Sequence, residues 1–214
     1  MSSSTTAHTD TKAGFGRTLV VGAIAGVIAS LVMAMFAMIA AATYQHSGFF
    51  TPLYHIGSVL IDPSTMMASM QQAMAGSNFY FAFGPAVVGA VVHMMVGAMY
   101  GIVFAVIVRM ARLRGVNLLI AGMIYGAIVF AVSTWIGLPL AAAILASGDQ
   151  IANMASMVGY GTFVTEHIMF GLATALAMLP FTRRATALPP CPGRGGSLSA
   201  VLAYAPTTPA WETP

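Results

Sequence analysis

The sequence predicts an all-α integral membrane protein: four transmembrane helices form two tandem hairpins, and an amphipathic helix covers the outer face. The first observation is composition, since 58% of the 214 residues are hydrophobic and only 6% are charged, whereas a soluble domain carries about 25% charged residues. The second is that uncharged apolar runs long enough to cross a bilayer recur along the chain. The third is a pattern that occurs twice, which indicates a duplicated hairpin.

Each expected span has recognisable limits. The first follows Arg17, and the second begins at Pro85, a residue that suits the first turn of a helix. The third is expected to kink or end at Pro139, and the fourth contains Glu166, the only carboxylate in any span. The spans are expected at about residues 19–44, 85–108, 117–138 and 159–181.

The basic residues define an orientation. All eight fall before the first span, between the second and third, or after the fourth, namely Lys12, Arg17, Arg109, Arg112, Arg114, Arg183, Arg184 and Arg194. The positive-inside rule then puts both termini in the cytoplasm of a bacterial cell whose inner membrane holds the protein. Residues 1–17 are expected to be a disordered cytoplasmic lead, residues 18–184 the four-helix domain, and the proline-rich residues 185–214 a disordered tail.

The outer segment 45–84 is rich in aromatic residues, as an interfacial belt requires. Within it Asp62 reads as the N-cap of an amphipathic helix that ends at Gly76. Met66, Met70 and Met74 recur every four residues and share one face of that helix. This face is expected to bury in lipid or core, and the alternative is a thioether site for Cu(I).

The repeated pattern is His-x-Met-x-Gly, which begins at His93 and again at His167, each sixteen residues before an arginine. The hairpins are therefore expected to be parallel repeats whose two histidines lie at equal depth and face the bundle interior. Glycines spaced by four residues let helices approach closely. The expected packing glycines are Gly22, Gly26, Gly89, Gly97, Gly101, Gly122, Gly126 and Gly171.

Ionisable side chains inside a span are costly, so His93, Glu166 and His167 form the expected polar site. Glu166 is expected to meet His93 or Thr162. Three interpretations stay open: hydrogen bonds that hold helices together, a path for protons or ions, and ligation of a metal or haem. Two imidazoles at one depth could hold a haem iron, and zinc or copper could also use His55 of the outer segment.

Several stretches together resemble YagU-type bacterial inner-membrane proteins: Val92-His93, residues 102–106, residues 122–126, and Glu166-His167 followed by Arg183-Arg184. The segment Phe50-Thr51-Pro52-Leu53 is also similar to an outer loop of four-span actinobacterial proteins. These resemblances imply an inner-membrane protein and draw attention to His93, Glu166 and His167. They imply no particular molecular activity.

No Walker loop, nucleophile elbow, HExxH pair or Rossmann glycine pattern occurs, and the single cysteine, Cys191, excludes disulfide exchange by a cysteine pair. A non-enzyme is therefore expected, with the lipid bilayer as its surroundings and no nucleic acid as partner. The predicted function is transport or envelope homeostasis, by a homo-oligomer or a subunit of a membrane complex, with a buried His/Glu site near the outer face and no cofactor. The alternative is a haem- or metal-binding electron-transfer subunit.

Overall fold

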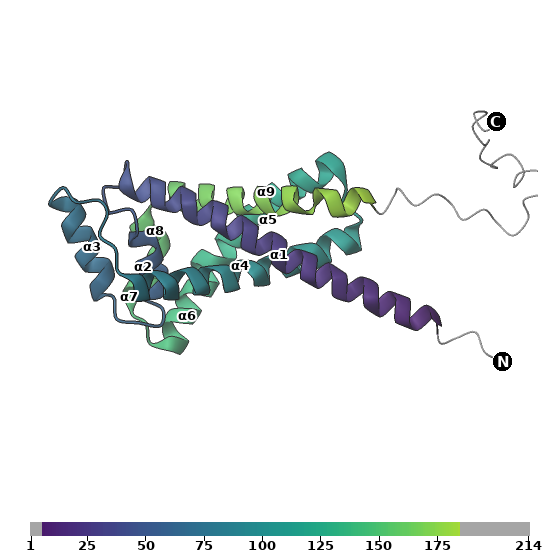
Figure 1. The fold of residues 1–214 in the computed structure, drawn as a ribbon, viewed down its shortest axis with the longest axis horizontal. Coiled ribbons are helices and arrows are strands. Elements are labelled where there is room, and N and C mark those ends of the chain that lie inside the picture. Colours follow the sequence, from purple (N-terminus) through teal and green to yellow (C-terminus); the bar gives the residue numbers. More distant parts are fainter. Residues whose placement is uncertain (1–5, 185–214) are drawn as a thin grey trace, which may run out of the picture.

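The structure, a computed structural model, describes residues 6–184, with side chains described over 14–182 (Figure 1). Over this range the secondary structure is helical, with no strand. Four helical stretches are long and apolar enough to cross a membrane. They are α1 (Thr6–Ala42), α4 (Phe83–Ala111), α9 (Tyr160–Arg184), and the continuous run of α5 (Gly115–Val132), η1 (Ser133–Gly137) and α6 (Leu138–Leu145). The prediction of an all-α protein with four transmembrane helices is confirmed.

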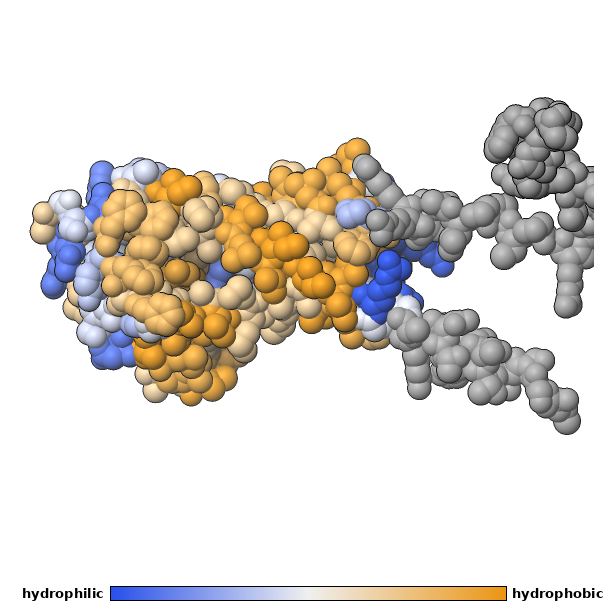
Figure 2. Space-filling view, in the orientation of Figure 1, coloured by the Kyte–Doolittle hydropathy of each residue, from blue (hydrophilic) through white to orange (hydrophobic). Residues whose placement is uncertain are grey.

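The two ends of the bundle differ in structure and in charge. At one end, which we call the arginine end, α1 begins, α9 ends, and Arg112 closes α4 in the left-handed conformation (φ 53°) just before α5. At the other end lies a helical cap made of α2 (Thr51–Gly57), α3 (Ser64–Met74), α7 (Asp149–Ala152) and α8 (Met154–Val158). Figure 2 shows apolar surface over the long helices and hydrophilic surface at both ends, as expected of a multi-pass membrane protein.

The helices differ in extent from the sequence-based expectation at two places. α1 is helical from Thr6, where a disordered lead was expected, and the expected disordered tail, 185–214, lies outside the described residues. The third span continues as a helix past Pro139 to Leu145. A π turn precedes the proline, with the amide of Leu138 bonded to the carbonyl of Ser133. The wider turn gives room for the proline ring, which collides with the i−4 carbonyl of a regular α-helix.

Within the cap, the methionines of α3 do not share one environment. Met66 is buried, Met70 is half-buried and Met74 is 76% exposed. Met66 joins Tyr54 and Ala86 in a small core of its own between α2, α3 and the start of α4. The methionine face therefore begins in the protein core and ends at the surface.

The two hairpins pack through matching small residues. In the first, where α1 lies against α4, a Cβ placed on Gly22 would come within 2.6 Å of the Cβ of Ala105. In the second, where α5 lies against α9, a Cβ on Gly122 would come within 2.6 Å of the Cβ of Ala175. Glycine is required at both places because the helix axes approach too closely for any side chain.

This packing register corrects the expected alignment of the histidines. A Cβ on Gly26 would collide with the carbonyl oxygen of Gly97, and a Cβ on Gly126 would collide with the carbonyl oxygen of His167. His167 therefore occupies the place of Gly97 in the repeat, not that of His93. Since each residue rises about 1.5 Å along a helix, this shift of four residues offsets the two histidines by about 6 Å relative to the matched glycines.

The two contacts between the hairpins are unequal. α1 packs closely on α9, where Ala29 and Met33 join Phe170 and Met178 in the main core. The matching pair in the repeat is α4 with α5, and these two helices make few contacts. The bundle is thus open along one side, between α4 and the run of α5, η1 and α6, which we call the α4–α5 seam.

Candidate functional site

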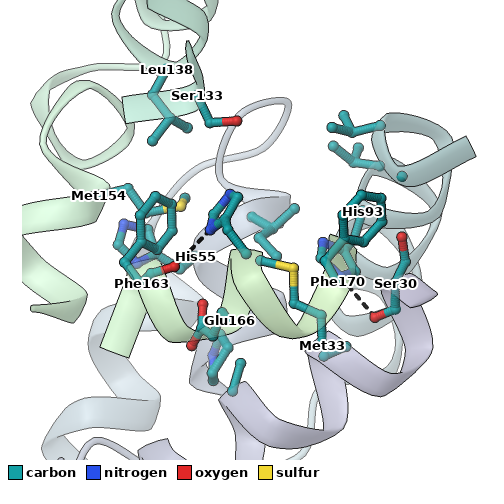
Figure 3. Close-up of a pocket in the computed structure, with 18 of the residues that line it drawn as sticks. Ser30, Met33, His55, His93, Ser133, Leu138, Met154, Phe163, Glu166 and Phe170 are labelled. Carbon is teal, nitrogen blue, oxygen red and sulfur yellow. Dashed lines mark hydrogen bonds between the residues drawn. The ribbon is translucent and has the colours of Figure 1, made fainter. Parts of the chain in front are cut away.

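A cavity of ≈330 Å³ lies at the α4–α5 seam, on the cap side of the bundle. Its walls come from α1, α4, α9 and the run from α5 to α6, and α2, α7 and α8 close it at the cap (Figure 3). Most of its lining is apolar. The polar side chains that reach it are those of Ser30, Gln45, His55, His93, Tyr100, Ser133, Glu166 and His167.

The seam is closed on the side of the arginine end by aromatic residues. The rings of Phe104 and Tyr125 lie 4.9 Å apart between centroids. The Tyr125 hydroxyl donates to the backbone carbonyl of Tyr100 at 2.7 Å, and the Tyr100 hydroxyl lies 3.2 Å from the hydroxyl of Ser133. Tyr100 and Ser133 form the floor of the cavity, and Phe104 and Tyr125 lie outside its lining.

Above this floor the cavity reaches the apolar outer surface of the bundle. Val96 and Met99 of α4 line it, yet 44% and 54% of their surface is exposed. On the opposite side, Leu138 follows the π turn and points towards the cavity (Figure 3). The cavity therefore lies directly beneath the apolar outer surface at this point.

His93 lies on α4 and is tied to α1. Its Nε2–H donates to the backbone carbonyl of Ser30 at 3.0 Å (Figure 3). The fully buried hydroxyl of Ser30 donates in turn to the carbonyl of Gly26 at 2.9 Å. This chain of bonds fixes the imidazole at the cavity wall and assigns the proton to Nε2, since a carbonyl only accepts.

His167 lies on α9 and is 6% exposed. Its Nδ1–H donates to the carbonyl of Phe163 at 2.7 Å, and its ring packs on those of Phe163 and Phe130, with centroids 4.5 and 6.0 Å away. Both histidines thus use one ring nitrogen to hold their own position. Over residues 14–182 no hydrogen bond occupies the other nitrogen.

Glu166 precedes His167 and is the buried carboxyl group of the cavity, with 4% of its surface exposed. It makes no hydrogen bond within the part of the chain whose side chains are described, although a bond to His93 or Thr162 was expected. The Thr162 hydroxyl instead lies 3.0 Å from that of Tyr44. Figure 3 shows Glu166 pointing away from the α9 side chains that face Ser133 and Leu138. The carboxyl group therefore has no internal counterpart to neutralise it.

His55 enters the cavity from the cap. Its Nε2–H donates to the carbonyl of Gln150 at 2.8 Å, which joins α2 to α7. Burial lowers the pKa of His55 below its usual value of 6.5, although the bond to Gln150 acts in the other direction. His55 is therefore a neutral link between the two halves of the cap near neutral pH.

The expected metal ligands do not form a three-residue ligand set within the described residues. Although His55, His93, Glu166 and His167 all line the cavity, no three His, Cys, Asp or Glu side chains of the described chain come close enough to hold a metal ion. The described His, Cys, Asp and Glu side chains therefore offer no preformed three-ligand site for zinc or copper. The haem hypothesis depends on two histidines at depths within about one helical turn of each other, and an offset of about one turn in the repeat stays within that limit. Ligation of a haem by His93 and His167 therefore stays a prediction.

The expected packing glycines divide into two groups. Most of them lie where two long helices contact each other, as where Gly101 faces Gly22 and Gly171 faces Gly122. Gly89, in contrast, faces the backbone of Leu53 in α2, so it seats the cap on α4.

Sequence reasoning missed Tyr100 and Ser133 as site residues. Tyr100 lies seven residues after His93, and this spacing puts both on one face of α4. That signal was available in the sequence. Ser133 reaches the cavity through the π turn, which no periodic pattern reveals.

Comparison with protein-family models, with curated proteins and with solved structures found no match. The resemblance to YagU-type proteins therefore stays a prediction.

Proposed function

We propose that this protein is a multi-pass transporter of the bacterial cytoplasmic membrane that takes lipophilic cations from the bilayer and exchanges them for protons. Both termini lie in the cytoplasm and the cap faces outwards. The placement is supported by the basic residues, since Arg17, Arg109, Arg112 and Arg114 all lie at the arginine end and the cap contains none.

The observation that carries the proposal is a buried carboxyl group without a described partner that lines a largely apolar cavity. A cavity of ≈330 Å³ falls in the usual range for small-molecule sites, about 300–1,000 Å³, which combine an apolar lining with a few polar groups. Glu166 is the only acidic residue in the described spans. An intramembrane carboxyl group of this kind is by default functional.

The complement of such a site is an apolar molecule with one positive charge. Without a ligand the carboxyl group is best kept neutral, because a lone buried carboxylate is poorly solvated. When a lipophilic cation enters, the O–H bond of Glu166 breaks, the proton passes to water, and the carboxylate pairs with the cation. Reprotonation reverses the step and frees the cation, so one proton is exchanged for each positive charge.

Binding of tetraphenylphosphonium to the purified protein in detergent tests the proposal. We expect Glu166→Gln to weaken binding at least tenfold, which corresponds to about 1.4 kcal/mol, whereas Glu212→Gln, outside the described residues, should bind like the parent. Binding by the parent should strengthen as pH rises, because protons compete for Glu166. Equal affinity for Glu166→Gln and the parent would refute the role of the carboxyl group.

The side entrance can be tested with a matched pair of substitutions on α4. Val96 lines the cavity and is 44% exposed, while Val103 is 46% exposed and is not part of the cavity lining. Val96→Trp should slow uptake of the probe from vesicle membranes, and Val103→Trp should leave it unchanged. If both variants take up the probe at the parent rate, entry does not use the seam.

A further inference from the structure

A second cavity of ≈330 Å³ lies at the arginine end, between α1, α4 and α9. Arginines form its rim: Arg17 comes from α1, Arg109 and Arg112 come from the end of α4, and Arg114 comes from the turn that follows. The inner wall is apolar. It consists of Val21, Ala105, Val108, Leu113, Met178 and Phe181.

One arginine of the rim is already engaged, and it shapes the cavity. The Arg109 guanidinium donates to the carbonyl of Gly14 at 2.9 Å and to the hydroxyl of Thr18 at 3.1 Å, and lies 5.9 Å from the centre of the Phe15 ring. These contacts hold the end of α4 against α1. Arg17, Arg112 and Arg114 are exposed and make no hydrogen bond or ion pair to described side chains.

No carboxylate of residues 14–182 neutralises this charge. The acidic residues of that range are Asp62 and Asp149 in the cap and Glu166 in the other cavity. The arginine end therefore keeps an excess of positive charge beside an apolar crevice. Arginine matches phosphate well because its planar guanidinium can donate two parallel hydrogen bonds.

We propose that this cavity binds an anionic phospholipid, with its phosphate on Arg17, Arg112 and Arg114 and its acyl chain along the apolar wall between α1 and α9. Two features favour a lipid over free phosphate. The wall next to the charges is apolar, and the cavity lies where the apolar surface of the long helices meets the hydrophilic surface of the arginine end (Figure 2). Basic pockets between transmembrane helices commonly hold such head groups. This site is separate from the Glu166 cavity, so either proposal can fail alone.

Native mass spectrometry of the full chain in detergent tests the proposal, with phosphatidylglycerol, cardiolipin and phosphatidylcholine added in turn. We expect both anionic lipids to bind at least tenfold more tightly than phosphatidylcholine. Arg112→Gln and Arg114→Gln should each reduce phosphatidylglycerol binding several-fold. Arg194→Gln is the matched control, because it removes the same charge from outside the described residues, and it should bind like the parent.

Four results would overturn the inference. These are equal binding of phosphatidylcholine, equal losses in Arg194→Gln and Arg112→Gln, parent-like binding by both rim variants, and displacement of the lipid by millimolar inorganic phosphate. Parent-like binding by both rim variants would show that Arg112 and Arg114 do not contact the lipid. Displacement by inorganic phosphate would show that the arginines bind a free anion. Circular dichroism of each variant shows whether it has folded, and parent-like tetraphenylphosphonium binding in Arg112→Gln shows that the Glu166 cavity is intact.

Discussion

Replacing Gly101 with alanine tests how closely the helices approach in the first hairpin. The new Cβ would lie 2.6 Å from Cα and 2.8 Å from N of Gly26, and would also collide with the carbonyl oxygen of Gly22. These neighbours are backbone atoms, which cannot rotate away as a side chain can. α4 must therefore move away from α1 by roughly 1 Å, and a gap of that size forfeits up to about half of the dispersion energy of each contact.

The net effect follows from two opposing contributions. Overpacking costs about 1–3 kcal/mol, and the rigid neighbours favour the upper part of that range. Against this, alanine stabilises a helix by about 1 kcal/mol relative to glycine because of its higher helix propensity. We therefore expect Gly101→Ala to lower the free energy of unfolding by about 1–2 kcal/mol, measured by titration with sodium dodecyl sulfate and followed by circular dichroism.

Two further variants complete this test. A Cβ on Gly16 of α1 meets no atom within 4 Å, so Gly16→Ala should stabilise the protein by up to about 1 kcal/mol. A Cβ on Gly171 would lie 2.7 Å from N of Gly126, and Gly171→Ala should lose as much as Gly101→Ala. A Gly101→Ala protein as stable as the Gly16→Ala protein would contradict the packing described here.

Three other predictions concern the cap, the seam and the topology. Burial lowers the pKa of His55 below 6.5, so as pH falls the histidine is protonated in the unfolded chain before it is protonated in the folded protein. The free energy of unfolding should therefore decline below about pH 6.5. Thermal denaturation of His55→Gln, which keeps an N–H donor for the carbonyl of Gln150, should show a weaker decline. Tyr125→Phe removes the donor to the Tyr100 carbonyl and should cost about 1 kcal/mol in a detergent titration, and an unchanged midpoint would show that this bond does not hold the seam. Cys191, outside the described residues, should react with an impermeant maleimide only in permeabilised cells, and labelling of intact cells would reverse the proposed orientation.

Composition and spacing were enough to predict the four long helices and their glycine contacts. Long apolar runs without charge are typical of membrane-spanning helices. Glycines four residues apart on such helices indicate where two helices approach closely. Spacing also selected His93, Glu166 and His167, which all line one cavity in the structure. Placing a polar side chain inside a membrane span costs free energy, so such a residue in an apolar run indicates a functional or structural role.

The sequence did not reveal the register between the hairpins or the open seam. Two short motifs that both begin with histidine suggested the wrong alignment, because a pattern of five residues cannot outweigh backbone contacts along a whole helix. The unequal packing of α1 with α9 and of α4 with α5 depends on side-chain volumes from four separate segments. No single stretch of sequence encodes it.

The π turn Ser133–Gly137 is a difference between the two hairpins. Its counterpart in the first hairpin, residues 33–37 of α1, is regular α-helix, and a π turn commonly holds one residue more than the α-turn it replaces. The wide turn can take up such a residue locally, and Leu138 and Ala141, which follow it, line the cavity. Deleting one residue within Ser133–Gly137 should restore a regular α-turn and bring the proline ring against the i−4 carbonyl, which would kink or break the third span. The wall of the cavity formed by α6 therefore depends on a turn that the first hairpin does not contain.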